Sequence, residues 1–305
     1  MTANAPHEGG TVVVKIGGAR AVDPAGALTD VAHLAATGER VVVVHGGSTA
    51  VDETLEALGE EPTYVETPGG VVGRFTDERT MEVFKMVMPG KLNTDLVEAL
   101  QNEGVDAVGL SGVDGGLLSG KRKSAVRVLE DGKKKIKRGE HSGTIESVNT
   151  DLLETLLAGG YVPVVGGPVL GEERDGGYTA VNADADRTAA AVAGALEADL
   201  VFLTDVSGIY SDPEDETTRI ETASTEAEFE AVQSAAEGFM TKKVMAAEEA
   251  LDGGAASVVV ADANANAPVL NALDGRGTTI TPGAIGLAEP ATDVESTGVV
   301  EVFEE

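Results

Sequence analysis

The sequence predicts an α/β protein: a three-layer αβα sandwich with a mainly parallel central sheet, divided into two lobes. Val-rich runs such as VVVV at 41–44 are continuous apolar segments of strand length, which is typical of strands buried on both faces. Helix-like stretches separate these runs along most of the chain. Alternation of this kind indicates parallel strands joined by crossover helices that cover both faces of the sheet.

The chain has 305 residues, enough for one large domain or two lobes, and it contains no cysteine. Disulfide frameworks, thiolate nucleophiles and Cys-based metal sites are therefore excluded. No window approaches the roughly 18 consecutive apolar residues of a membrane span. The first segment, MTANAPHEGG, lacks the basic and apolar regions of a signal peptide, so we expect a soluble cytoplasmic protein without a membrane partner.

The expected elements follow in chain order. In an amino-terminal lobe, residues 1–175, three buried strands each end in Gly-Gly: VVVKIGG (12–18), VVVVHGG (41–47) and VPVVGG (162–167). The helices expected in this lobe span 23–38, 49–59, 77–104 and 149–160. In a second lobe, residues 176–280, helices at 186–198, 242–254 and 268–275 alternate with strands at 199–208, 256–262 and 278–280.

Two segments depart from the alternation. Residues 115–148 are predicted to form short strands and turns, with Asp131-Gly132 as the tight turn of a β-hairpin inserted in the first lobe. After Ile280 the chain has no helical face and becomes increasingly acidic. Residues 281–305 are therefore expected to form a loosely attached tail.

Gly-Gly directly after a buried strand lets backbone N–H groups approach a ligand closely, and the helix that follows favours an anion at its N-terminus. A single Gly-Gly can equally be a tight strand-to-helix turn. Three at the carboxyl ends of parallel strands predict a shared crevice for anionic groups, because open α/β sheets bind ligands at that edge. The pattern is not GxGxxG, and a near-match to the Walker motif fails because Arg122 replaces its Ser or Thr.

Two lysines are candidates for phosphate contacts. Lys15 lies inside the apolar run VVVKIGG, where a purely structural lysine would cost several kcal/mol unless it were paired. Lys243 stands at the start of an expected helix, where the alternative is a pair of solvated lysines. Two ammonium groups that face one crevice suit a transferring phosphoryl group.

Acidic and basic residues at other helix starts have both structural and functional interpretations. Asp184 and Asp186 open an alanine-rich helix, whose dipole favours carboxylates at its N-terminus. Asp184 also fits a carboxylate placed between the two lysines, where it would orient them and keep them charged. Arg74 precedes a helix capped by Thr76 or Asp77, and it is either a surface arginine or a fork for a substrate carboxylate.

Histidine and serine chemistry is not indicated. The four histidines, at positions 7, 33, 45 and 141, lack the spacing of a metal cage, and no G-x-S-x-G elbow is present. The chemistry is therefore expected to depend on lysines, carboxylates, backbone amides and the cofactor Mg²⁺.

Several motifs, in this order, together resemble the amino-acid kinase family over about residues 11 to 280: KIGG (15–18), HGG (45–47), RFTDERTMEVFKMVMPGKLN (74–93), SVNTDLL (147–153), VNADAD (181–186), LTDVSGIY (203–210) and MTKKVMAA (240–247). The RFTD segment and the N-A-D motif are similar to the N-acetylglutamate kinase branch. That branch phosphorylates the side-chain carboxylate of an acylated amino acid with MgATP.

The resemblance implies a role for each site residue. Lys15 and Lys243 would neutralise the phosphates in the transition state, and Asp184 would organise these two catalytic lysines. The amino-acid substrate would be held by Gly46, Gly47, Arg74 and Asn182. The nucleotide would lie near Gly17, Gly18, Thr204, Asp205, Gly208 and Tyr210. A carboxylate of pKa about 4 is already an anion at neutral pH, so the reaction needs no general base.

The expected hairpin is strongly basic. Nine of the chain's 22 basic residues lie in it: Lys121, Arg122, Lys123, Arg127, Lys133, Lys134, Lys135, Lys137 and Arg138. A merely solvated hairpin is not expected to hold them in a chain of net charge −30, so the patch predicts a specific acidic partner. Nucleic acid is disfavoured, because aromatic residues do not interleave and the acidic body repels it.

The segments SGVDGGLL (111–118) and GEHSGTIESVN (139–149), with the basic run, are similar to the LysW-dependent kinases. Those kinases act on glutamate or 2-aminoadipate that is attached through its amino group to a small acidic carrier protein. The resemblance implies that the basic residues bind the carrier. One alternative is a plain N-acetylglutamate kinase, which would not need the hairpin. The other is a non-catalytic nucleotide sensor, which the two retained lysines disfavour.

The acidic residues are spread evenly over the chain, 52 of them against 22 Lys and Arg. Such a surface suits a cytoplasm of molar salt, where the screening length falls to about 3 Å, so we interpret the chain as halophilic. An acidic chain that attracts a basic partner is the alternative. The sequence does not separate glutamate from 2-aminoadipate, because one methylene is worth only about 1–3 kcal/mol. A symmetric homodimer is expected on general grounds.

Overall fold

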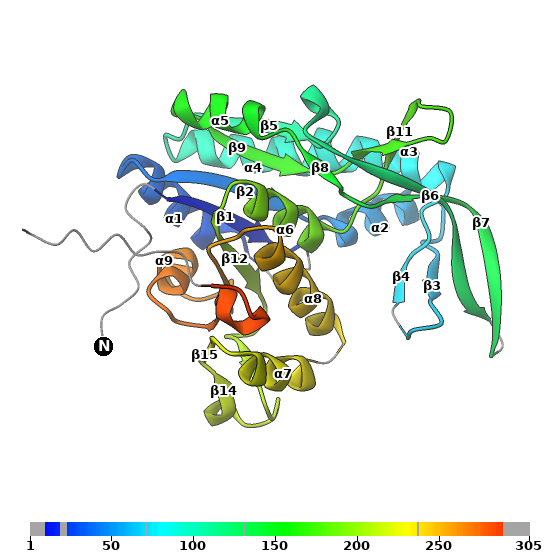
Figure 1. Ribbon diagram of the computed structural model, residues 1–305. Helices are drawn as coiled ribbons and strands as arrows, with labels where there is room; N and C mark the ends of the chain where they lie inside the picture. The colour runs from blue at the N-terminus through cyan, green and yellow to red at the C-terminus, as the bar shows by residue number, and fades with distance from the viewer. Residues whose placement is uncertain (1–9, 19–22, 71, 131, 237, 289–305) are drawn as a thin grey trace, which may run out of the picture.

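The computed structural model describes residues 10–18, 23–70, 72–130, 132–236 and 238–288, which fold into three layers around a central sheet (Figure 1). Eight strands form this sheet in the order β15-β17-β16-β12-β1-β2-β9-β5. Strand β17 runs antiparallel to β16, and the other neighbouring strands are parallel. The bounds are β1 (Thr11–Ile16), β2 (Arg40–His45), β5 (Ala107–Ser111), β9 (Val162–Gly166), β12 (Asp199–Thr204), β15 (Thr222–Ala223), β16 (Ser257–Asp262) and β17 (Thr278–Ile280).

Alternation along each buried strand sends side chains to two separate cores. Val12, Val14 and Ile16 of β1 pack with α1 (Ala25–Ala36), α4 (Asn93–Asn102) and α9 (Pro268–Leu273). Val13 points to the opposite core, formed with α5 (Thr150–Ala158), α6 (Ala185–Ala195), α7 (Glu226–Ala235) and α8 (Phe239–Asp252). Helices therefore cover both faces, and the predicted three-layer α/β architecture is confirmed.

The helix expected over 77–104 is interrupted. It consists of α3 (Glu78–Met86), a π-helical segment over Val87–Leu92, and α4. Pro89 and Gly90 lie inside the π-helical segment, where the missing N–H of proline prevents a regular α-helical ladder. This π-helical segment packs in a third core with α3 and α2 (Ser48–Ala57), and this packing holds α2 beside the end of β2.

Two antiparallel hairpins project beside each other from one end of the sheet (Figure 1). The longer one is the expected basic hairpin, β6 (Leu118–Glu130) and β7 (Lys133–Gly143), and its register shifts between Lys123 and Ala125. The shorter one, β3 (Tyr64–Glu66) and β4 (Val72–Arg74), has no counterpart in the expected elements. Its strands are too short for a periodic pattern.

The described chain also contains shorter strands and 3-10 turns. They are β8 (Ser147–Val148), β10 (Val169–Glu172), β11 (Tyr178–Val181), β13 (Ile209–Tyr210), β14 (Arg219–Ile220) and 3-10 turns at Asp114–Gly116, Glu216–Thr218 and Pro282–Ile285. The prediction of a loosely attached tail from residue 281 onward is wrong for the 3-10 turn Pro282–Ile285. Pro282 and Ala284 are buried, and Ala284 joins the core of α6 and α8, so the chain stays packed beyond Ile280. Residues 289–305 of that tail lie outside the described residues.

Candidate active site

Lys15 lies at the carboxyl end of the central strand β1. Because Val13 and Lys15 point to the same face of the sheet, the Lys15 side chain faces α6 and α8. Its neighbours in register are Val44 on β2 and Phe202 on β12. These apolar walls leave only 7% of the Lys15 side chain exposed, so its ammonium group needs a partner within the protein.

That partner is Asp186, which also binds Lys243. The Lys15 Nζ lies 2.5 Å from Asp186 Oδ1, and the Lys243 Nζ lies 2.9 Å from Asp186 Oδ2. The side chains of Lys243 and Asp186 are each 12% exposed, and the Lys243 ammonium lies 5.7 Å from the centre of the Phe202 ring. Two buried cations share one anion, so the cluster has a surplus positive charge that an incoming phosphate would balance.

Burial and charge shift the pKa values of this cluster. Burial lowers the pKa of Lys15, and the nearby Lys243 ammonium lowers it further, while Asp186 opposes both effects. Burial alone would raise the pKa of Asp186, but the two ammonium groups outweigh it and hold that pKa below its ordinary value. Asp186 is therefore an anion at neutral pH, and it favours the charged form of Lys15 most strongly, with a smaller contribution from Asp184.

The carboxylate between the lysines is Asp186, and the expectation that it would be Asp184 is wrong. Asp184 is the N-cap of α6, where its Oδ1 accepts hydrogen bonds from the backbone N–H groups of Asp186 and Arg187. A cap residue turns toward the helix terminus, whereas a residue in the first turn can face the sheet. Both aspartates fit the helix-start pattern, and only the packing of α6 on β1 separates them.

The first two Gly-Gly pairs meet backbone to backbone. A Cβ atom on Gly18 would lie 2.4 Å from Gly47 N, so this contact requires glycine. A Cβ on Gly47 would lie 2.3 Å from a methyl carbon of Leu92, which is part of the π-helical turn. The Gly46 N–H is already donated to Ile16 O at 3.2 Å. The N-terminus of α2, which follows Gly47 and has no side-chain cap, is the part of this loop that can receive an anion.

The third Gly-Gly pair, Gly166-Gly167, packs against side chains. A Cβ on Gly166 would lie 2.4 Å from His45 Nε2, and one on Gly167 would lie 2.8 Å from the Phe84 ring. The expectation of three equivalent anion loops is therefore too broad, because this pair makes room for His45 and Phe84.

His45 and Asn93 form a buried pair that sequence reasoning missed. The Asn93 Nδ2 lies 3.1 Å from His45 Nε2 and donates to Val164 O at 2.8 Å. His45 Nε2 therefore accepts, and its Nδ1–H donates to Gly46 O at 3.1 Å. Burial lowers the pKa of His45, which keeps the ring neutral. The pair fixes the turn that leads from β2 into α2.

Arg74 is not a free surface arginine. Its side chain is 7% exposed, its Nη2 lies 2.9 Å from Asp52 Oδ1, and it donates to Ser48 O at 2.7 Å. The Tyr64 hydroxyl donates to the other Asp52 oxygen at 2.7 Å. The buried Arg74 Nε has no hydrogen-bond partner in the described part of the chain. Arg74 is thus held on β4, beside the start of α2, by its contacts with Asp52 and Ser48.

Asn182 lies between β11 and the α6 cap. Its Nδ2 donates to Thr76 Oγ1 at 3.1 Å, and its backbone pairs with the base of β7. The cap of α3 is Asp77, whose Oδ1 accepts from Thr80 N at 2.8 Å, so Thr76 is left for another role.

The expected nucleotide residues follow the ends of β1 and β12, which are adjacent in the sheet. Gly17 and Gly18 follow β1. Thr204 ends β12 and donates from Oγ1 to Asp205 Oδ1 at 3.1 Å. Gly208 has a φ of 148°, a value suited to glycine, and leads into Tyr210, which pairs with Arg219. The set follows the carboxyl ends of these two adjacent strands.

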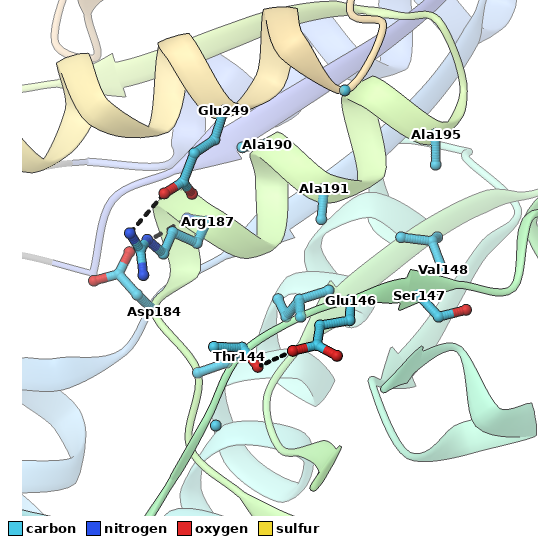
Figure 2. A pocket seen from close by; sticks show the side chains of 14 residues that line it. Thr144, Glu146, Ser147, Val148, Asp184, Arg187, Ala190, Ala191, Ala195 and Glu249 are labelled. Atoms are coloured by element: carbon cyan, nitrogen blue, oxygen red, sulfur yellow. Dashed lines mark hydrogen bonds and ion pairs between the residues drawn. The ribbon is translucent and has the colours of Figure 1, made fainter. Parts of the chain in front are cut away.

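A pocket of about 490 Å³ lies behind the α6 N-terminus, between residues 143–148 and the helices α6 and α8 (Figure 2). Alanines of α6 form part of its wall, and its charged groups are engaged within the protein. Arg187 binds Glu249 at 2.6 Å, Glu146 binds Lys121 at 3.0 Å, and Asp184 caps the helix. The pocket therefore offers no unpaired cation to an anionic ligand.

The basic hairpin has two different faces. Directly opposed residues of antiparallel strands share a face, so Arg127, which opposes Ile136, lies with Lys134 and Arg138. Ile136 is 65% exposed at the middle of this outward face. The other face holds the buried Val128, and Lys137 there lies 4.2 Å from the Phe75 ring centre. Three more of the nine are ion-paired: Lys121 with Glu146, Arg122 with Glu173, and Lys135 with Glu130.

Comparison with known proteins identifies the family of this chain. Residues 10–262 match the model of the amino acid kinase family. The chain is 42% identical over 271 residues to a LysW-aminoadipate kinase of Thermus thermophilus, which covers 88% of this chain and 99% of the relative. It is 39% identical over 270 residues to an acetylglutamate kinase of Methanopyrus kandleri, again over 88% of this chain and 99% of the relative.

A solved structure gives the same fold. N-acetylglutamate synthase from Neisseria gonorrhoeae, complexed with coenzyme A and N-acetylglutamate, superposes with a TM-score of 0.70 at 26% identity, over 90% of this chain and 59% of that protein. No helix in the described part of this chain is long and apolar enough to cross a membrane. The chain belongs to the amino acid kinase family and is a phosphotransferase that uses ATP.

Proposed function

We propose that this enzyme phosphorylates the side-chain carboxylate of glutamate and/or 2-aminoadipate that is linked through its amino group to a small acidic carrier protein. The product is an acyl phosphate of arginine or lysine biosynthesis. The observation that carries the proposal is the outward face of the basic hairpin, where Arg127, Lys134 and Arg138 surround the exposed Ile136. A free amino acid is too small to need such a face.

The reaction moves no proton. A carboxylate oxygen of the acceptor attacks the γ-phosphorus of ATP, the bond to the bridging oxygen breaks, and ADP leaves with the electron pair. Lys15 and Lys243 stabilise charge on the transferring group, because their shared Asp186 neutralises only one of the two ammonium charges. The N-terminus of α2 adds backbone donors from the substrate side.

Mg²⁺ bound with the nucleotide would screen the charge of the phosphates from the incoming carboxylate. Within the described residues there is no group of three or more His, Cys, Asp or Glu side chains that could hold a metal ion. The ion would be held mainly by the nucleotide, as Mg²⁺ commonly is.

The acceptor would be held by Arg74 and Asn182. Asp52 already neutralises part of the Arg74 charge, so Arg74 fits directional recognition of the carboxylate next to the linked nitrogen better than strong attraction of a free dianion. Linkage through nitrogen also has a chemical purpose, since a free amine would attack the new acyl phosphate and cyclise.

N-acetylglutamate kinase activity is the alternative, and the acetylglutamate kinase relative supports it at a comparable identity. The hairpin favours the carrier, because close cations around an apolar residue form a docking face for an acidic protein. We also propose that the enzyme works in a cytoplasm of high salt and as a homodimer, from its net charge of −30 and from general symmetry considerations.

We predict that Asp186→Asn lowers kcat by about 10²–10³, since the two ammonium groups lose the anion that orients them. Asp184→Asn is the matched control. It keeps a side chain that can cap α6, so the Tm should change little, and kcat should fall less than in Asp186→Asn. Steady-state kinetics of both folded variants measure this. Equal losses in the two variants would contradict the assignment of Asp186.

A second prediction concerns pH. Burial lowers the pKa of Lys15, so its positive charge, and with it kcat, should be lost at a pH below the ordinary lysine value of about 10.4. The drop should move to still lower pH in Asp186→Asn, because the charge and hydrogen bond of Asp186 raise that pKa more than the charge of Asp184 does. A pH profile of kcat measures both. Loss of activity around pH 6.5 on the acid side would instead indicate a histidine base.

A third prediction separates the two enzyme assignments. Reversing Arg127, Lys134 and Arg138 to Glu should raise the KM for carrier-linked substrate by about tenfold or more and leave the KM for ATP unchanged. Reversal of Lys121, Lys133 and Lys135 changes the charge equally but leaves the outward face intact, so its effect should be smaller. Wild-type enzyme that ignores carrier-linked substrate and phosphorylates N-acetylglutamate well would establish the alternative.

A fourth prediction follows from the net charge. Lowering salt from molar to about 0.1 M lengthens the screening distance from about 3 to about 10 Å, so carboxylates repel over a longer range. The Tm should therefore fall. Differential scanning calorimetry across a KCl series tests this, and a Tm that is constant or higher at low salt would rule out the high-salt interpretation.

A further inference from the structure

Thr76 is a polar residue with no exposed surface, and it lies between the base of the basic hairpin and Asn182. It precedes α3 but does not cap it, because Asp77 fills that role. Its hydroxyl instead accepts the hydrogen bond from Asn182 Nδ2 at 3.1 Å. A fully buried hydroxyl with one long-range partner, 106 residues away in the sequence, suggests a specific function for that contact.

The backbone around Thr76 closes a ring with the base of β7. The His141 N–H donates to Thr76 O at 2.7 Å, and the Asn182 N–H donates to His141 O at 2.8 Å. The Gly143 N–H then donates to Asn182 O at 3.0 Å. These hydrogen bonds fix the backbone of Asn182, and its side chain still has two torsions, of which the second rotates the amide.

We infer that Thr76 is a positioning residue: its hydroxyl fixes the rotation of the Asn182 amide, so that Oδ1 and the second N–H of Nδ2 present a defined donor–acceptor pair to the acyl acceptor. The inference rests on the proposed function in so far as Asn182 contacts that acceptor. The terminal torsion of asparagine has a broad energy minimum, so without a partner the amide samples several orientations. Ordering it on binding would then weaken the binding of the acceptor.

The same junction connects Asn182 to the proposed docking face. Strand β7 carries Lys134 and Arg138 on its outward face and reaches Thr76 and Asn182 through His141 and Gly143. Lys137 covers Phe75, the residue before Thr76. The backbone N–H of Thr76 donates to Oε1 of the buried Glu140, with 3.4 Å between the nitrogen and the oxygen. The proposed docking face and the contacts that hold Asn182 therefore lie on the same strand, β7.

The test compares Thr76→Val with Thr76→Ser, and uses Thr80→Val as a matched control. Thr80 is also buried and lies one turn further along the same chain segment, but it makes no side-chain contact with Asn182. Thr76→Val should raise the KM for the acyl acceptor about three- to tenfold, as expected for the loss of one hydrogen bond, with the KM for ATP unchanged. Thr76→Ser should restore the wild-type KM, and Thr80→Val should not change it.

A double-mutant cycle makes the test independent of overall stability. In an Asn182→Ala background, Thr76→Val should have no further effect on the KM for the acceptor, because the hydroxyl acts through Asn182. Additive effects would overturn the inference, as would equal changes in the KM values for acceptor and ATP, or failure of Thr76→Ser to restore binding. If Thr76→Val does not fold, Thr76→Ala takes its place under the same criteria.

The experiment also separates this inference from the proposed function. Each variant is assayed with carrier-linked glutamate, carrier-linked 2-aminoadipate and N-acetylglutamate. If the wild type uses only N-acetylglutamate, the carrier assignment fails, and the Thr76 comparison is made with N-acetylglutamate. If the wild type uses a carrier-linked substrate and Thr76→Val behaves as Thr80→Val does, the Thr76 inference alone fails.

Discussion

Two buried ammonium groups that share one carboxylate are the interaction on which the rest of this structure depends. Lys15 belongs to the central strand, Lys243 to α8 and Asp186 to α6, so one ion cluster joins the sheet to two of the helices that cover that face. A buried cluster with an unequal number of charges destabilises the free protein. A negatively charged phosphoryl group can balance the second ammonium charge. The charge excess that destabilises the free protein then stabilises the transferring group.

The loops that follow β1, β2 and β9 pack closely because glycine residues have no side chain at the points of contact. Gly18 and Gly47 let two backbone turns touch, and Gly166 makes room for His45, which Asn93 holds in a single tautomer. These contacts hold the uncapped N-terminus of α2 next to the carboxyl ends of β1 and β2. The π-helical turn completes the arrangement because it brings Leu92 against Gly47 and places Asn93 against His45.

Charge is divided between the body and the hairpin. The chain has a net charge of −30, yet the outward face of β6 and β7 is basic, while Lys121 and Lys135 nearby are paired with local carboxylates. Arg127, Lys134 and Arg138 lie on the face that a partner can reach. The hairpin base is hydrogen-bonded to Thr76 and Asn182, so the proposed docking face and the proposed acceptor site are parts of one continuous strand.

The sequence alone determined the layers, the order of the main elements and the basic hairpin, and it singled out Lys15 and Lys243 as candidates, because burial patterns, glycine pairs and charge runs are local in the chain. Tertiary structure decided which of Asp184 and Asp186 lies between the lysines, since both fit a helix start and only helix packing orients them. It also decided the partners of Arg74, the His45–Asn93 pair and the Thr76–Asn182 contact. These interactions join residues far apart in sequence, and no local pattern encodes a distance between side chains that only folding brings together.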